Sequence, residues 1–582
     1  MSEPGKIVVV GGVAGGMSAA ARARRLSESA QIIVLERDQH VSFANCGMPY
    51  HIGGDIGERS ALLVQTPKSL ADNLALDVRV GNEVVAIDPG THSLTVRDIN
   101  SGRTYTESYD KLVLATGAAP LKPAIPGVDS PLVHTLRNLA DMDRIKTVVD
   151  SRVGRAVVVG GGYIGVEMVE ALRHRDWDVT LLEAADQVMG PLDHEMAEQV
   201  RAELERNGVR VLLETTAQGF TDDSVLTSDG VLPADLVILA IGVVPDSRLA
   251  QMAGLRTTER AAIIVDDHQL TSDPDIYAVG DSVEVTDTVT GMPTVVPLAG
   301  PANRQGRIAA DHMFGRDARY TTTQGTAIVK VFDLTAGGTG ANEKILRRHG
   351  IDYRKVYVHP NGHASYYPGT AAMHLKLLFA ADDGRVLGGQ VVGYDGVDKR
   401  IDVLAVAVRA GLTVWDLAEL ELAYAPPYGS AKDPINMAGF QGSNLLDGTI
   451  ELWYPQDWGN LPADAVILDV RTERENLECA LPMSVNIPVQ ELRERYEEID
   501  QDRPVYVYCR SGFRSYLAYR MLKGLGFQQV ATLSGGTLTM EHSVPWLRPL
   551  NGHREPIINY AEEDAACALE VLDEVPFANA TD

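Results

Sequence analysis

Two of the cysteines stand in sequences that suit thiol chemistry, and Cys46 is the first of them. It lies in Ser-Phe-Ala-Asn-Cys-Gly-Met-Pro-Tyr, residues 42–50. A proline there is typical of a first helical turn, so we expect a helix end to stabilise the Cys46 thiolate and make it reactive. Taken alone, a free cysteine is more often a small buried hydrophobic residue. The chemical interpretation of Cys46 therefore depends on its surroundings.

Cys509 ends an apolar stretch and opens the loop Cys-Arg-Ser-Gly-Phe-Arg, residues 509–514. Successive backbone N–H groups in such a loop form a nest that binds anions. Arg510 and Arg514 add positive charge, so the loop suits a thiolate and its persulfide. Cys479 and Cys567 have no comparable setting, and we treat them as structural.

Thiol redox chemistry needs a bound cofactor that supplies electrons, and two glycine-rich segments have a pattern that suits cofactor binding. In the second of them, an apolar strand at residues 155–159 runs into Gly160, Gly162 and Gly165, and a later strand ends at Glu183. This pattern predicts a βαβ unit that binds a dinucleotide. The glycines let the backbone approach the pyrophosphate, the helix N-terminus attracts it, and the acid accepts hydrogen bonds from a ribose.

The first segment repeats this design closer to the N-terminus. A strand at residues 6–10 leads into Gly11 and Gly16, and the following strand ends at Glu36. Val13 takes the place of the middle glycine. One such motif is weak evidence, but two copies with strand, helix and acid in register predict two dinucleotide sites.

The overall composition excludes some classes of function. The chain has 582 residues, which suggests about four domains, and 52 basic against 79 acidic residues give a net charge of −27. So acidic a surface argues against nucleic-acid binding. We also expect no signal peptide and no membrane span. Four scattered cysteines with no C-x-x-C pair form neither a disulfide framework nor a zinc ribbon. We therefore expect a cytoplasmic α/β protein with no structural metal.

Further motifs bring a family resemblance. Residues 113–120 and 238–245 are similar strand–glycine turns, and Thr-Ser-Asp-Pro-Asp-Ile-Tyr-Ala-Val-Gly-Asp follows at 271–281. The chain thus resembles the flavoprotein disulfide reductases with two dinucleotide-binding domains. Residues from 458 on resemble a rhodanese domain, because Asp-Val-Arg at 469–471, Asn-Ile-Pro at 486–488 and the Cys509 loop occur in family order.

This resemblance implies the domain organisation and the cofactor contacts. It implies an FAD domain at 1–115 and 246–325, an NAD(P)H domain at 116–245, an α+β dimerisation domain at 326–440, a linker at 441–457, an α/β rhodanese domain at 458–550 and an acidic tail at 551–582. The implied FAD contacts are Gly11, Val13, Ala14, Gly16, Glu36, Arg37, Val84, Thr116, Gly117, Asp281 and Ala299. The implied nicotinamide contacts are Gly160, Gly162, Tyr163, Ile164, Gly165, Glu183 and Gly242.

The absence of a second cysteine near Cys46 in the sequence limits the resemblance to those members of the family that use a single thiol. A single thiol can cycle through sulfenic acid, as in NADH oxidases and peroxidases, or through a mixed disulfide, as in coenzyme A-disulfide reductases. The sequence around Cys46 resembles the second group, and Ala14 stands where the peroxidases carry a histidine. The implied coenzyme A contacts are Ser18, Arg22, Arg25, Ser42, Asn45, Asn303 and Lys432, although some reductases have histidine in place of Asn303.

Tyrosines complete the implied site. In the family, tyrosines near Tyr366 and from Tyr424-Ala-Pro-Pro-Tyr428 reach the partner subunit's thiol, so we expect a homodimer. Whether Tyr366 or Tyr367 matches stays open. Packing at the core or the interface is the alternative role for each ring.

The resemblance implies an enzyme in which NADH reduces FAD and Cys46 then acts on coenzyme A persulfide, polysulfide or coenzyme A disulfide. Cys509, with Arg514 beside it, would handle the sulfane sulfur. Glu183 favours NADH by repelling the 2′-phosphate of NADPH, but Arg173 and Arg175 lie nearby, so NADPH stays open as a donor. Two alternatives remain. One is an NADH oxidase or peroxidase that uses Cys46 sulfenic acid, and the other is a reductase on which the rhodanese unit senses sulfane sulfur.

Overall fold

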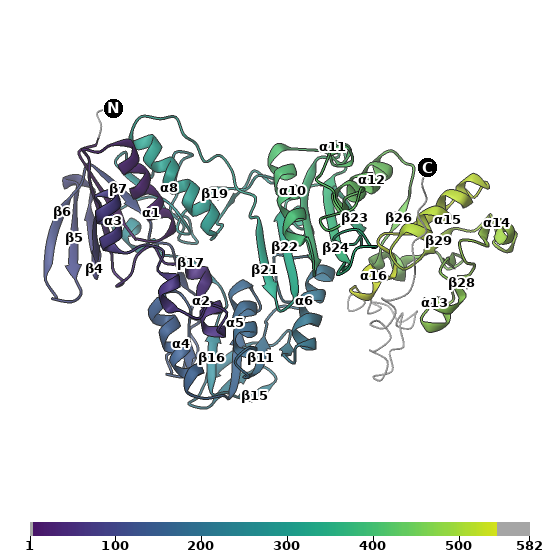
Figure 1. The fold of residues 1–582 in the computed structure, drawn as a ribbon, viewed down its shortest axis with the longest axis horizontal. Helices are drawn as coiled ribbons and strands as arrows, with labels where there is room; N and C mark the ends of the chain where they lie inside the picture. The colour runs from purple at the N-terminus through teal and green to yellow at the C-terminus, as the bar shows by residue number, and fades with distance from the viewer. Residues whose placement is uncertain (1–3, 544–582) are drawn as a thin grey trace. The chain divides into compact units, whose positions relative to one another are not determined.

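The computed structural model describes residues 4–543. They divide into two compact units, whose elements are labelled in Figure 1. The first unit comprises the chain up to Asp193 together with Val200–His349, and the second comprises His194–Gln199 together with the chain from Gly350 on. The predicted tail at 551–582, with Cys567, lies outside the described residues.

The apolar run that opens the chain forms the centre of a parallel sheet. Continuous β-branched sequence suits strands that are covered on both faces. The strands, in the order β18-β7-β1-β2-β3, are Ile276–Ala278, Lys111–Leu114, Lys6–Val10, Gln31–Glu36 and Asp77–Val80. Helix α1 (Ala14–Leu26) follows β1 and packs against α8 (Ala299–Met313), where Gly306 approaches the chain so closely that a Cβ would lie 2.1 Å from the Gly15 oxygen.

The second glycine-rich segment builds a second parallel sheet in the same unit. Its strands, in the order β12-β11-β10-β16-β9, are Arg210–Leu212, Asp178–Leu182, Arg155–Val159, Leu236–Leu239 and Val133–His134. Helix α5 (Tyr163–Arg173) follows β10 as α1 follows β1. The two similar strand–turn motifs pair with each other, because β8 (Ala118–Pro120) and β17 (Val243–Pro245) form an antiparallel ladder where the chain crosses between the sheets. The duplicated pattern in the sequence is thus a duplicated fold.

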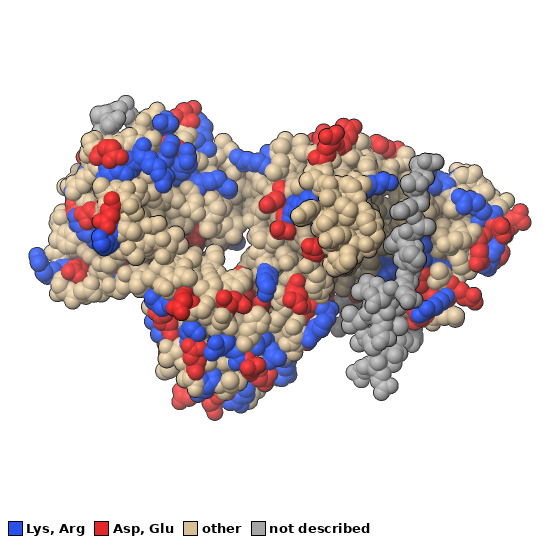
Figure 2. Space-filling model, viewed as in Figure 1, with Lys and Arg blue, Asp and Glu red and all other residues tan. Residues whose placement is uncertain are grey.

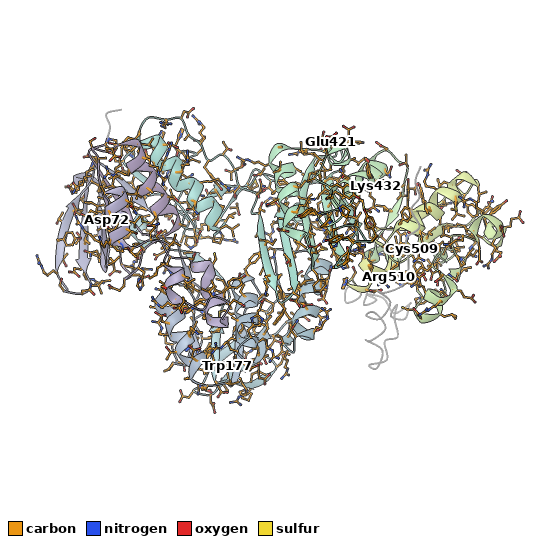
Figure 3. All side chains as sticks on the ribbon, viewed as in Figure 1. Asp72, Trp177, Glu421, Lys432, Cys509 and Arg510 are labelled. Atoms are coloured by element: carbon orange, nitrogen blue, oxygen red, sulfur yellow. The ribbon has the colours of Figure 1, made fainter. Side chains whose placement is uncertain are left out.

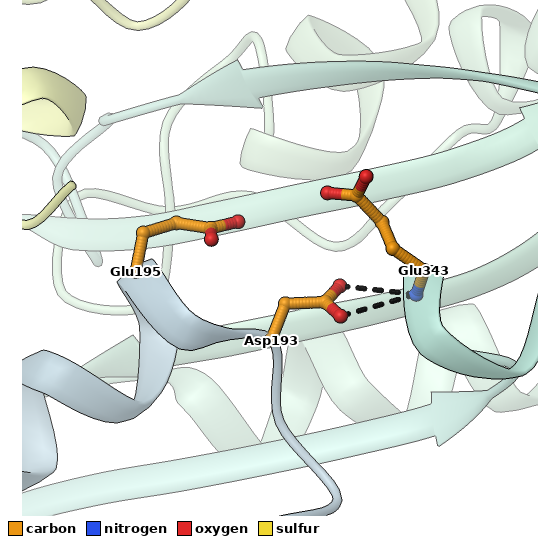
Figure 4. A group of neighbouring side chains, drawn as sticks. All are labelled: Asp193, Glu195 and Glu343. Carbon is orange, nitrogen blue, oxygen red and sulfur yellow. Dashed lines mark hydrogen bonds between the residues drawn. The ribbon is translucent and has the colours of Figure 1, made fainter. Parts of the chain in front are cut away.

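Smaller antiparallel elements complete the first unit. They are β4 (Asn82–Asp88), β5 (Ser93–Asp98) and β6 (Thr104–Ser108), then β13 (Ala217–Phe220), β14 (Ser224–Thr227) and β15 (Gly230–Pro233), and the hairpin β21 (Ala327–Val331) and β22 (Leu334–Gly340). After this hairpin, the Asp193 carboxylate accepts the backbone N–H of Glu343 at 3.1 and 3.3 Å, which holds the start of α9 (Glu343–Arg348; Figure 4).

The second unit begins with antiparallel strands and the helices that follow them. The strands are β23 (Tyr353–Val358), β24 (Met373–Ala380) and β25 (Val386–Gly393), and the helices are α10 (Val397–Ala410), α11 (Val414–Glu419) and α12 (Pro434–Leu446). Helix α12 extends into the predicted linker at 441–457. The reason is apolar packing, since Leu445 contacts the next core. Polar and glycine residues in this stretch had suggested a turn-rich segment.

The C-terminal part of the second unit is a parallel α/β sheet. Its strands, in the order β26-β30-β29-β27-β28, are Leu452–Trp453, Val530–Leu533, Val505–Tyr508, Val466–Asp469 and Val485–Asn486. Strand β26 already joins this sheet ahead of residue 458, the predicted boundary. Helices α13 (Glu473–Glu478), α15 (Phe513–Gly524) and α16 (Gly536–Glu541) flank the Cys509 loop. Within residues 4–543, every helix is too short or too polar to cross a bilayer.

Candidate active site

The glycines of the two turns have distinct physical roles. Gly11 has φ +103°, and a Cβ there would lie 2.2 Å from the Ala115 oxygen. Gly160 has φ +107°, and its Cβ would lie 2.4 Å from the Ala240 oxygen. Neighbouring backbone and a positive φ exclude a side chain at both positions, so glycine is required there whether or not a ligand binds. Gly162 differs, because a Cβ there would meet nothing within 4 Å. The middle glycine therefore faces open space, which fits an approaching dinucleotide.

Two acidic residues hold their turns in the same way. Glu36 accepts the backbone N–H of Gly12 at 2.7 Å and of Asp38 at 2.9 Å. Glu183 accepts those of Gly161 at 2.7 Å and Ala185 at 2.9 Å. Each carboxylate keeps acceptor capacity for a ribose hydroxyl. Burial raises the pKa of Glu36, although its backbone hydrogen bonds oppose the shift.

One cleft collects most of the predicted FAD contacts. Those that line it are Gly11, Val13, Ala14, Glu36, Arg37, Val84, Thr116, Gly117 and Asp281. Gly16 and Ala299 do not line it; Gly16 lies beneath the turn, and Ala299 starts α8. Sequence reasoning missed Arg137, which also lines the cleft and donates to the Thr116 oxygen at 3.2 Å. The start of α1 at the glycine turn, the ribose acceptor Glu36 and the part-buried Asp281 fit FAD.

Cys46 lies in a short 3₁₀ turn, Asn45–Gly47, just ahead of α2 (Met48–Gly53). The residue is exposed, and its backbone N–H donates to Asn45 Oδ1 at 3.2 Å. Although the residue is exposed, the surrounding protein excludes part of the water around the thiol, which raises the pKa of Cys46, and the carboxylates of Glu167 and Asp281 raise this pKa further. The expected helix end is present, since α2 begins two residues after Cys46 with Pro49 in its first turn. The direction of the pKa shift differs from the expected one, because water exclusion and two carboxylates outweigh this short helix.

Glu167 is a site residue that sequence reasoning missed. It lies on α5, the helix that follows the second glycine turn, and Tyr50 Oη donates to its Oε1 at 3.4 Å. Burial raises the pKa of Glu167 to about 7. The fold thus brings Cys46, the FAD cleft through Asp281, and the helix of the second turn into one neighbourhood. The available signal was an acid one turn into an apolar helix that follows a dinucleotide motif.

Four of the predicted coenzyme A contacts of the first unit lie along α1 and α8. Ser18 donates to Asn303 Oδ1 at 2.6 Å. Arg22 is half-buried and paired with Asp311 at 2.6 Å, a partner that sequence reasoning missed. Arg25 is exposed. Figure 2 shows Lys and Arg side chains gathered over these helices. Ser42 has φ +49° in the loop that leads to Asn45 and Cys46.

The predicted tyrosines and Lys432 lie in the second unit. Tyr366 and Tyr424 share a hydrogen bond between their hydroxyl oxygens at 2.8 Å, and this bond raises the pKa of Tyr366. Tyr367 instead packs edge-on against His363. Of the two rings, Tyr366 is therefore the one that is joined to the Tyr424 segment. Tyr428 is exposed on a turn of the same segment, and Lys432 is exposed nearby in sequence (Figure 3).

The Cys509 loop directs a backbone N–H at the thiol, as the predicted anion nest requires. Cys509 is buried at the end of β29, and the backbone N–H of Gly512 donates to its Sγ at 3.2 Å. Arg510 follows it directly (Figure 3). Arg514 is held by Glu475 of α13 at 2.6 and 2.7 Å. Burial opposes ionisation of Glu475, but its hydrogen bonds from Arg514 and Thr472 lower its pKa to about 2. Arg514 therefore supplies its charge to the loop as part of a fixed pair.

Comparisons with known proteins agree with this geometry. Residues 5–306, more than half of the chain, match the family model described as pyridine nucleotide-disulphide oxidoreductase. This chain belongs to that family. Residues 326–433 match the dimerisation domain of the family, and residues 451–539 match a rhodanese-like domain. The prediction of a flavoprotein enzyme of this family with a rhodanese domain is confirmed.

This chain covers nearly the full length of several relatives. A coenzyme A disulfide reductase of Staphylococcus aureus is 36% identical over 439 residues, which cover 75% of this chain and 99% of that protein. The solved structure of reduced Bacillus anthracis CoADR-RHD is 46% identical with a TM-score of 0.92, over 94% of this chain and 99% of that one. A NAD-dependent persulfide reductase from A. fulgidus is 38% identical with a TM-score of 0.86, over 92% and 99%.

In this flavoprotein reductase, Gly162→Ala is expected to weaken NADH binding at least about tenfold, or about 1.4 kcal/mol. The reason is that the methyl group fills space otherwise open to the dinucleotide, while its backbone at φ −82° suits alanine. The free energy of unfolding should change by at most about 1 kcal/mol. Calorimetric titration with NADH and urea unfolding check this. Gly160→Ala is the matched variant, and it should destabilise the fold instead.

Glu167→Gln is expected to lower the pH at which Cys46 is half alkylated in the reduced holoenzyme. The carboxylate of Glu167 raises the pKa of Cys46, so a neutral amide makes the thiolate easier to form. The alkylation rate measured against pH checks this. Glu205→Gln, at an exposed position on α6 (His194–Arg206), is the control and should leave the profile unchanged. A profile of Glu167→Gln that moves upward would contradict the electrostatic account.

Proposed function

We propose that this enzyme reduces coenzyme A persulfide, polysulfide or coenzyme A disulfide with NADH, through Cys46 as its single redox thiol. One observation carries the proposal. Cys46 is the only cysteine before residue 479, and it lies beside the FAD cleft and the helix of the second dinucleotide turn. The described residues of the first unit contain no second cysteine, so a disulfide of Cys46 within that unit takes its partner from the substrate. The similarity to coenzyme A disulfide and persulfide reductases supports this choice.

The residues define the proposed steps. The Cys46 thiolate attacks the inner sulfur of coenzyme A persulfide, releases HS⁻ and retains coenzyme A as a mixed disulfide. Two-electron cleavage of that disulfide returns the thiolate and free coenzyme A. FAD and NADH, when bound, supply the electron pair. In a homodimer, the hydroxyls of Tyr366 and Tyr424, hydrogen-bonded to each other, would reach the thiol of the partner subunit and donate a proton to the departing thiolate.

The coenzyme A contacts and the second thiol belong to the same proposal. Ser18, Arg25, Ser42, Asn45 and Lys432 would bind the coenzyme, and Arg22 would act from its pair with Asp311. Asn303 would act through its hydrogen bond with Ser18. Cys509 would accept sulfane sulfur as a persulfide in its loop. Because the reduction of coenzyme A disulfide needs no such sulfur carrier, Cys509 favours persulfide as the substrate.

Further parts of the proposal concern assembly and location. The exposed Tyr366, Tyr424 and Tyr428 belong to a segment that matches a dimerisation domain, which supports a homodimer. The expectation of a cytoplasmic enzyme rests on the scattered cysteines. Static light scattering of the purified holoenzyme, which gives its molar mass in solution, checks dimer formation. The molar mass of a monomer at micromolar concentration would contradict the proposal.

Mass spectrometry tests the proposal. The holoenzyme is denatured with and without reductant, and both the released coenzyme A and the mass carried by Cys46 are measured. Coenzyme A that is freed only by reductant supports the mixed disulfide. An added oxygen on Cys46 without coenzyme A would favour the oxidase or peroxidase. Turnover with coenzyme A persulfide against coenzyme A disulfide then identifies the substrate.

The nucleotide preference is a separate expectation. Glu183 is held by its own turn, so its carboxylate stays where the 2′-phosphate of NADPH would approach. We expect kcat/KM to be higher for NADH than for NADPH. Steady-state kinetics with both nucleotides check this, and a much higher efficiency with NADPH would contradict it.

A further inference from the structure

Two adjacent glycines connect the Cys509 loop to a different part of the second unit. Gly535 precedes α16 and Gly536 is its first residue, with φ +73° and +65°. Gly536 faces the loop, because a Cβ there would lie 2.4 Å from the Cys509 oxygen and 2.5 Å from the Arg510 oxygen. The first turn of α16 also donates to these two oxygens from the backbone N–H groups of Thr537 and Leu538, at 2.9 and 3.0 Å. Helix α16 therefore holds the backbone that carries the Cys509 thiol.

The neighbouring glycine faces the end of β23. A Cβ on Gly535 would lie 2.7 Å from His359 Nε2 and 2.0 Å from Thr539 Oγ1. His359 follows β23 directly, and its Nε2 is hydrogen-bonded to Thr539 Oγ1 at 2.8 Å. This pair fixes α16 against a strand that lies far from the loop in sequence, and the Tyr357 N–H of β23 also donates to Ser534 Oγ just ahead of α16, at 3.2 Å.

His359 works at this contact as a neutral hydrogen-bonding group. Burial lowers its pKa to about 3, so the ring carries no charge at neutral pH. The ring of His374, which follows the start of β24, lies 4.7 Å away at a steep angle. A ring held on both sides has little freedom to let α16 shift.

We propose that His359 is a positioning residue for the sulfur-carrying loop, acting on Cys509 through Thr539, Gly535 and the first turn of α16. The inference rests on the proposed role of Cys509 as a sulfane-sulfur acceptor. The Gly512 N–H lies 3.2 Å from Cys509 Sγ, and this alignment depends on the loop backbone that α16 supports. Loss of the contact therefore misaligns the nest while leaving the thiol in place.

Four variants test this role with thiosulfate as the sulfur donor. The Cys509 thiolate attacks the outer sulfur of thiosulfate, the S–S bond of thiosulfate breaks, and sulfite leaves as the persulfide forms. Persulfide formation on Cys509 is followed by intact mass after rapid quenching, over a range of thiosulfate concentrations. We expect His359→Ala and Thr539→Val to lower the maximal rate about tenfold and to leave the half-saturating concentration within about twofold, as lost orientation does. His359→Gln, which retains a nitrogen near the position of Nε2, should recover most of the rate.

Tyr454→Phe is the matched control. It removes another hydrogen bond within the second unit, from Tyr454 Oη to the Lys355 oxygen at 2.8 Å, that does not involve α16. The rate of this variant should stay within about twofold of the unsubstituted enzyme. Because Thr539→Val keeps the size of the side chain, it decides the question if His359→Ala does not fold.

The outcomes separate the inference from the function on which it rests. If the unsubstituted enzyme takes up no sulfur on Cys509, the proposed function of that thiol fails, and the positioning role fails with it. If it takes up sulfur and Thr539→Val does so at the same rate, only the role of the His359 contact is overturned. An equal loss of rate in Tyr454→Phe would likewise overturn it, because the effect would then not be specific to α16.

Discussion

Cys46→Ser is expected to lower NADH-dependent turnover of coenzyme A disulfide and coenzyme A persulfide by at least about 10³-fold. Serine keeps the size of the side chain but cannot form the mixed disulfide, so the substrate is no longer joined to the enzyme. FAD content should be unchanged, since Cys46 itself does not line the cleft, and Asn45, the residue of its turn that does, is kept. NADH oxidation with each substrate, together with flavin absorbance, measures both.

Cys479→Ser is the control for this variant. Cys479 is also exposed, but it lies in the second unit, and its backbone oxygen, rather than its thiol, accepts a hydrogen bond from Arg471. Its turnover should match that of the unsubstituted enzyme. Turnover of Cys46→Ser within about tenfold of normal would contradict a role for covalent catalysis. An NADH oxidase activity that disappears with Cys46, in an enzyme that never releases coenzyme A, would favour the sulfenic-acid cycle.

Cys509→Ser should lower the rate of persulfide formation on the rhodanese part by at least about 10³-fold, because a hydroxyl does not accept sulfane sulfur. Reduction of coenzyme A disulfide should continue at the normal rate, since that reaction needs only Cys46. Turnover with polysulfide should fall. Intact mass measures persulfide formation. The rates of NADH oxidation with coenzyme A disulfide and with polysulfide show whether the variant loses turnover of polysulfide alone.

The pattern across substrates distinguishes catalysis from sensing. If Cys509→Ser leaves turnover intact with every sulfur substrate, the rhodanese part acts as a sensor rather than a sulfur carrier. Ser515→Ala is the matched control in the same loop. The Ser515 hydroxyl lies 3.4 Å from Cys509 Sγ, so its removal keeps the thiol and should slow sulfur uptake only modestly.

The backbone design of the site could be predicted from the sequence because it follows local rules. The glycine turns, the acids Glu36 and Glu183, and the Cys509 loop lie in short segments whose strand, turn and helix signals are contiguous. The extent of α12 was harder to predict, because Leu445 stabilises its end through contact with a core that forms from later residues.

The electrostatics of the site could not be predicted from sequence, because the partners are distant along the chain. Arg22 pairs with Asp311, and Arg514 with Glu475. Two arginines that look like free anion ligands in the sequence are thus held by carboxylates. The same reason explains Cys46, whose pKa is raised by burial and by Glu167 and Asp281 rather than lowered by a helix.

The two acids that close the glycine turns affect the thermodynamics of cofactor loading. Because Glu36 and Glu183 already bind the backbone N–H groups of their own turns, the loops are ordered by folding itself. Ordering a residue costs about 1–2 kcal/mol of conformational free energy, and here that cost does not fall on the binding step. Dinucleotide association should therefore show little loop-ordering entropy, and the apoprotein should present both turns in their final shape.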